Sequence, residues 1–68
     1  MILDDLYKSE INFKIATDWD AGWTVALGNE YSGFVAETNV RSFDDACKWL
    51  RAEAIKHFPN SDFARAAG

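Results

Sequence analysis

Three short segments in the first 40 residues alternate apolar with polar or small side chains, and glycine-containing turns separate them. The segments cover residues 11–16, 23–27 and 34–39. Their alternating apolar side chains are Ile11, Phe13, Ile15, Trp23, Val25, Leu27, Phe34 and Ala36. A period of two residues is that of a strand with one buried face. Because the connections Asp18–Gly22 and Gly28–Gly33 are short, the pattern predicts a three-stranded antiparallel meander.

A helix is predicted to follow the sheet, because residues 42–58 carry apolar side chains at the spacing of one helix face. Ser42 is of the type that caps a helix N-terminus, and Asp45 stands three residues later as an acidic variant of the capping box. Pro59 ends the helix, and the residues after it are expected to form one more turn. The apolar face consists of Phe43, Ala46, Cys47, Leu50, Ala54 and Phe58.

A first helix is expected over residues 2–9, with Asp4 and Asp5 in the first turn, where the helix dipole favours acidic side chains. The predicted class is therefore α+β, with the order α-β-β-β-α in one compact domain of residues 1–68. Both helices are expected to cover one face of the sheet and to bury Phe13, Val25, Leu27, Leu50 and Phe58 together. The other face is expected to meet solvent with the small or polar residues Asn12, Lys14, Ala16, Thr24, Ala26, Val35 and Glu37.

The size of the chain limits what it can contain. A chain of 68 residues buries only about 60% of its unfolded surface, which leaves no room for a deep active-site cleft. One cysteine and one histidine exclude an internal disulfide and a Cys/His metal site, so packing must hold the core of a monomer or weak dimer. The sequence has no apolar run of membrane-spanning length and no signal-like start, which favours a cytoplasmic protein.

The net charge of −4 is unevenly distributed. Residues 1–40 carry seven acidic and two basic side chains, a balance of −5, whereas residues 41–68 carry four acidic and five basic ones, a balance of +1. Between Ile15 and Val40 there is no lysine or arginine. Binding to the phosphates of nucleic acid needs a basic surface, so we expect no direct nucleic acid partner. The acidic stretch instead favours a protein partner with a basic surface.

The residue types that could perform catalysis are few, and each has a structural explanation. His57 lies towards the apolar face of the second helix and is interpreted as a packed or edge residue. Cys47 lies in the middle of that face and is expected to be buried and inert. The acidic pairs, which fit first helical turns and one loop turn, are Asp4/Asp5, Asp44/Asp45 and Asp18/Asp20. We therefore predict no enzyme, no metal site and no cofactor.

Two aromatic residues, Trp19 and Tyr31, fall in the predicted turns. Trp19 stands between Asp18 and Asp20. In one interpretation its ring folds over a helix end and covers the small core. In the other it anchors an interface, because exposed Trp and Tyr side chains are frequent hot spots of protein binding. Tyr31 has the same two interpretations, and the sequence leaves them open.

The α-β-β-β-α order resembles the double-stranded-RNA-binding domain over essentially the whole chain, at the level of topology. That family grips phosphates with lysines at the start of its last helix. Here the corresponding residues 42–46 read Ser-Phe-Asp-Asp-Ala, and Lys48 alone does not replace the lysines. The turn Asp18–Gly22 also lacks the histidine-bearing loop of the family. RNA binding is therefore disfavoured.

The runs Trp19–Gly28, Gly33–Glu37 and Pro59–Ala64 are similar to short acidic proteins of bacterial prophages and mobile elements. Some small acidic proteins of that kind are anti-CRISPR inhibitors, including inhibitors of type I surveillance complexes, and several occupy a DNA-binding surface. The resemblance implies an inhibitor that works in the bacterial cytosol.

The first hypothesis is an inhibitor that imitates DNA, with carboxylates in place of phosphates and aromatic anchors beside them. The residues expected to bind the partner are Asp18, Trp19, Asp20, Glu30, Tyr31 and Glu37. Its partner would be a basic surface such as that of a type I CRISPR surveillance complex. The alternative is an adaptor or structural module without catalysis, which binds a protein through the open sheet face or an edge strand.

Overall fold

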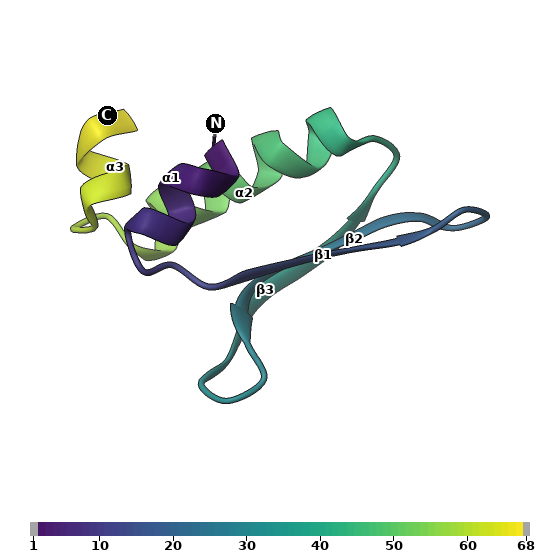
Figure 1. The fold of residues 1–68 in the computed structure, drawn as a ribbon, viewed down its shortest axis with the longest axis horizontal. Coiled ribbons are helices and arrows are strands. Elements are labelled where there is room, and N and C mark those ends of the chain that lie inside the picture. The colour runs from purple at the N-terminus through teal and green to yellow at the C-terminus, as the bar shows by residue number, and fades with distance from the viewer. Residues whose placement is uncertain (1, 68) are drawn as a thin grey trace.

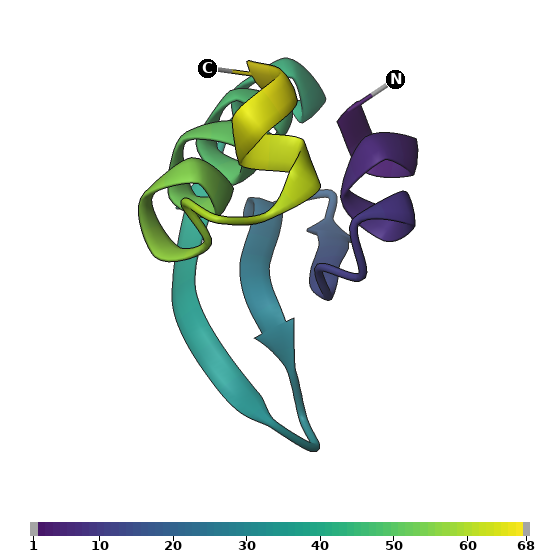
Figure 2. The same cartoon turned by 90° about the vertical axis from the view of Figure 1, so that its left-hand side faces the viewer.

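The computed structural model describes residues 2–67, and it has the predicted α+β architecture (Figure 1). One helix precedes a three-stranded antiparallel sheet, and two helices follow it. The elements are α1 (Ile2–Lys8), β1 (Phe13–Asp18), β2 (Gly22–Asn29), β3 (Gly33–Val40), α2 (Phe43–His57) and α3 (Asp62–Ala67). All the helices lie on the same side of the sheet, which confirms the predicted arrangement (Figures 1 and 2).

The strands follow one another in the order β1-β2-β3, so β2 is the central strand. Lys14 of β1, Ala26 of β2 and Glu37 of β3 lie opposite one another in one row. This row belongs to the open face, the face turned away from the helices. Ala26 is only 1% exposed although it lies on that face. Its methyl group is short, and the longer side chains of the same row stand on both sides of it.

The core lies between α2 and β2. Val25 and Leu27 of β2 and Leu50 of α2 are fully buried. Ala46 and Ala54, one turn before and after Leu50, are buried as well, so the helix backbone approaches the sheet closely. Phe13 and Phe58, which were predicted to be buried with these residues, pack against them but remain partly exposed. The predicted core is thus confirmed at its centre, and the two phenylalanines form its margin.

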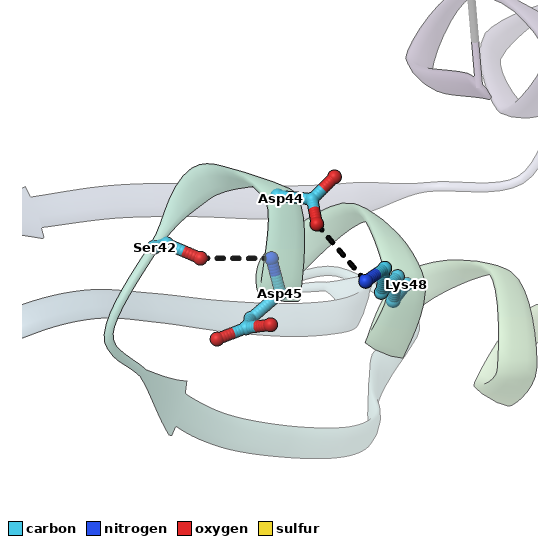
Figure 3. A network of polar contacts seen from close by, with 4 residues as sticks. All are labelled: Ser42, Asp44, Asp45 and Lys48. Carbon is cyan, nitrogen blue, oxygen red and sulfur yellow. Dashed lines mark hydrogen bonds and ion pairs between the residues drawn. The ribbon is translucent and has the colours of Figure 1, made fainter.

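The start of α2 is built as predicted. Ser42 has extended backbone angles, and its hydroxyl accepts a hydrogen bond from the amide of Asp45 at 3.1 Å (Figure 3). This bond satisfies one of the amide groups that a helix N-terminus leaves without a partner. Asp44 points outward and forms an exposed ion pair with Lys48 one turn later, at 3.1 Å (Figure 3).

The end of the chain contributes more to the core than the sequence analysis assigned to it. The extra turn expected after Pro59 is the helix α3, and Ser61 caps it by accepting a hydrogen bond from the amide of Ala64 at 3.1 Å. The same hydroxyl donates to the carbonyl of Phe58 at 2.7 Å. These bonds turn the chain back onto α2, so that Phe63 is buried in the core cluster.

The prediction for β3 was wrong at its beginning. Phe34 was expected on the covered face with Ala36, but it lies opposite Gly28 and is 42% exposed. The pairing shifts between Leu27 and Gly28, so Val35 is an extra residue in β3 without a partner in β2. Such a bulge breaks the alternation of side chains, and it turns Phe34 to the open face.

Replacing Leu50 by alanine is expected to reduce the free energy of unfolding by about 2–5 kcal/mol, because a large side chain would be lost from a fully buried position. Urea denaturation followed by circular dichroism measures this loss. Lys56→Ala on the exposed side of the same helix is the control and should change stability by less than about 0.5 kcal/mol. An unshifted transition for Leu50→Ala would contradict the assignment of the core.

Candidate functional site

The β1–β2 tip (residues 19–21) is a three-residue loop between paired residues Asp18 and Gly22. The amide of Ala21 donates to the carbonyl of Asp18 at 2.9 Å, which closes a β-turn. Gly22 follows with φ of 90°, a conformation that favours glycine. A β-turn followed by a residue in the left-handed backbone conformation is a common connection in hairpins with three-residue loops. The tip therefore has a defined shape.

The β2–β3 tip (residues 30–32) has the same construction between Asn29 and Gly33. The side-chain oxygen of Asn29 accepts hydrogen bonds from the amides of Tyr31 at 3.0 Å and Ser32 at 2.7 Å. Gly33 has φ of 92°. The six-residue loop expected over Gly28–Gly33 is therefore shorter, because Gly28, Asn29 and Gly33 belong to strands. An asparagine side chain replaces the backbone acceptor of the turn here.

Each tip presents an aromatic ring to solvent. Trp19 is 97% exposed and Tyr31 is 98% exposed. The interpretation in which the Trp19 ring covers the core is therefore excluded, and the same holds for Tyr31. Each ring has acidic neighbours in the chain: Asp18 and Asp20 flank Trp19, and Glu30 precedes Tyr31. All these acidic side chains are exposed.

The fold separates the two tips. They lie at opposite ends of the eight-residue strand β2, a span of roughly 25 Å at about 3.3 Å per residue (Figure 1). Glu37, the sixth predicted residue, lies on the open face between them. The predicted residues therefore do not gather into one pocket. They form two small groups at the ends of a sheet face and a single acid between them.

Two basic residues that the sequence analysis placed outside the acidic stretch lie beside the tips. Arg41 lines a surface hollow of about 370 Å³ with Trp19 and Asp20. Lys14 lines a second hollow, of about 180 Å³, with Glu30 and Tyr31. The tip acids nevertheless form no ion pair within residues 2–67, where the contacts between acidic and basic side chains include Asp44–Lys48 and Glu53–His57.

The two residues considered for catalysis lie on α2, away from both tips. His57 is exposed, and its Nε2 atom lies 3.1 Å from Oε2 of Glu53 one turn earlier, an acidic neighbour that the sequence analysis missed. Cys47 is only partly buried, contrary to expectation. Burial, and to a lesser extent the charge of Asp44, raise the pKa of its thiol. Within residues 2–67 no three metal-binding side chains of His, Cys, Asp or Glu come together.

Comparison of the chain with protein-family models, with curated protein sequences and with solved structures finds no match. Over residues 2–67, no helix has the length and apolar character needed to cross a membrane.

Alanine at Gly22 and at Gly33 is expected to destabilise the protein by different amounts. Both positions have φ near 90°, so each substitution costs about 1–2 kcal/mol in backbone conformation. At Gly22 the new Cβ would also lie 2.7 Å from the carbonyl oxygen of Val40, whereas at Gly33 it would meet no atom within 4 Å. Gly22→Ala should therefore cost at least about 1 kcal/mol more in urea denaturation. Equal losses would show that the β1–β2 tip does not lie against the end of β3.

The Cys47 thiol is expected to react several-fold more slowly with a disulfide reagent at pH 8 in the folded protein than in urea. The raised pKa lowers the fraction of thiolate, which is the reactive form. Absorbance of the released thiol measures the rate. Asp44→Asn should increase the rate modestly, because it removes a negative charge that disfavours the thiolate. Equal rates in the folded and unfolded chain would rule out the inert assignment.

Proposed function

We propose that this protein is a non-catalytic inhibitor that binds the basic, nucleic-acid-binding surface of a protein partner. The two hairpin tips make the contacts. Their partner-binding residues are Asp18, Trp19, Asp20, Glu30 and Tyr31, with Glu37 on the open face between the tips.

The observation that carries this proposal is the near-complete exposure of Trp19 and Tyr31 on two rigid turns. A large aromatic ring that stays in water does not contribute the stabilisation that its burial would give. A small domain has little buried surface, so it has few large rings from which to build its core. Because one turn is held by a backbone hydrogen bond and the other by hydrogen bonds to the Asn29 side chain, little conformational entropy is lost when the rings enter a partner. Exposed Trp and Tyr side chains on fixed loops are typical of binding anchors.

The charges beside the rings favour a basic partner. Asp18 and Asp20 at one tip and Glu30 at the other are exposed and form no ion pair within residues 2–67. Carboxylates spaced along a sheet can meet lysine and arginine side chains that are placed for the phosphates of DNA. Opposite charges would also accelerate association. Arg41 and Lys14 lie beside the tips and reduce the negative electrostatic potential there, but they form no ion pairs with the tip acids.

The resemblance to small acidic prophage proteins suggests the identity of the partner. We assign the protein to the anti-CRISPR class, acting in the bacterial cytosol on a type I surveillance complex and competing with target DNA. This assignment rests on the resemblance and on the acidic tips together.

A second candidate function is an adaptor that uses the open face of the sheet. The exposure of Phe34 and Val35, at 42% and 44%, favours it. In that case the acidic side chains of the tips would keep the protein soluble, and binding would depend on Phe34 and not on Trp19.

The inhibitor proposal predicts that binding weakens steeply with salt and with the loss of tip acids. Asp18→Asn, Asp20→Asn and Glu30→Gln, introduced one after another, should each reduce affinity for a type I surveillance complex and flatten its salt dependence. Trp19→Ala should raise the Kd by roughly 30-fold, equivalent to about 2 kcal/mol. Electrophoretic mobility shift of target DNA, measured across ionic strengths, follows the competition.

The control is Asp44→Asn with Asp45→Asn, which removes the same kind of charge from the start of α2. It should spare binding and reduce helix stability slightly, because acids in the first turn interact favourably with the helix dipole. If the triple neutral variant competes with DNA as well as the parent does, the imitation of phosphates is refuted. If Phe34→Ala abolishes binding and Trp19→Ala does not, the adaptor function is favoured instead.

A further inference from the structure

Strand β3 forms a free edge of the sheet, because it pairs only with β2. Its backbone groups can be assigned a direction. The amide of Gly28 donates to the carbonyl of Asn12 at 2.7 Å, so Gly28 turns its backbone groups towards β1. In antiparallel strands this direction alternates, so Val25 and Leu27 turn towards β3. The partners of those two residues, Thr38 and Ala36, therefore turn towards β2.

The alternation leaves the backbone groups of Glu37 and Asn39 directed away from the sheet. Such a row of unpaired donors and acceptors is a template for another strand. We propose that β3 pairs antiparallel with β3 of a second copy of this chain, with the two-fold axis at Asn39. The two sheets then form one continuous sheet, and all the helices lie on one of its faces.

The position of the axis follows from charge. With the axis at Asn39, Glu37 of each copy lies opposite Arg41 of the other, and the symmetry forms this pair twice. An axis at Glu37 would instead bring two like charges together, which destabilises a strand pair. An axis at Thr38 would place Glu37 opposite Asn39 and lose the charge pair. Glu37 and Arg41 are both exposed, so each can reach a partner.

In this register, residues 38–40 of the two copies pair within β3, and Arg41, which directly follows the strand, faces Glu37 of the other copy. Helix α2 lies above β2 and β3, on the side of the molecule opposite α1 (Figure 2). The α2 helices of the two copies would therefore run near each other above the joined strands.

The other edge of the sheet is less suited to this pairing. Strand β1 has six residues against eight in β3, and α1 lies on its side of the molecule (Figure 2). It carries Lys14 near its middle, and a lysine on a short edge strand is a common defence against pairing. A symmetric β1 pair could still place Lys14 opposite Asp18, so Lys14→Glu serves as the matched control.

Sedimentation equilibrium of the isolated chain tests the proposal without any other protein, so its outcome is separate from that of the inhibitor proposal. The parent should approach twice its monomer mass of 7.7 kDa as concentration rises. Glu37→Arg and Arg41→Glu should each raise the dimer Kd about tenfold or more, because each places like charges opposite each other twice. The double variant should return to the parent value, since the pair is restored with its signs exchanged.

Amide hydrogen exchange by NMR provides a second readout that does not depend on variants. The amide protons of Glu37 and Asn39 should become protected as concentration rises, while those of Ile15 and Thr17 on the outer side of β1 should stay fast. A chain that remains monomeric at NMR concentrations, with all four amides exchanging rapidly, would overturn the proposal. Loss of association in Lys14→Glu but not in Glu37→Arg would also overturn it, because the β1 edge would then form the dimer.

Discussion

The contact between α2 and the central strand β2 is the interaction on which the rest of the structure depends. Leu50 belongs to one buried cluster with Val25 and Leu27, and the alanines one turn on either side let the helix approach closely. Every other strand is hydrogen-bonded to β2, and both hairpin tips extend from its ends. Residues 2–67 contain one buried core cluster, so no second core there could hold the tips if this contact failed.

Each tip has a turn fixed by hydrogen bonds and an aromatic ring that is exposed to solvent. Gly22 and Gly33 let the chain reverse within three residues, and hydrogen bonds inside each turn keep it in that form. Trp19 and Tyr31 are left in water as a result. The proposed binding role would account for this exposure, because a rigid aromatic side chain loses little entropy when it enters a partner.

The proposed inhibitor and the proposed dimer use different parts of the sheet and share Glu37. Pairing of β3 would join Glu37 to Arg41 of the second copy and would leave both tips of each copy exposed. Arg41 also lines the hollow beside Trp19, so its engagement at the dimer would reduce the positive charge near that tip. Self-association could therefore strengthen the acidic field that a basic partner meets, and it would present four tips in place of two.

The sequence by itself determined the features that depend on neighbours in the chain. The two-residue alternation predicted the strands, Ser42 and Pro59 marked the limits of α2, and the acidic turn pointed to Trp19. Three features needed the tertiary structure, namely the bulge that exposes Phe34, the burial of Phe63 and the positions of Lys14 and Arg41 beside the tips. Each of them depends on pairing register or packing between residues distant in sequence. The alternation indicates which face each strand residue takes, but it did not reveal the bulge or the contacts between distant segments, so only the folded chain could decide which charges and rings meet.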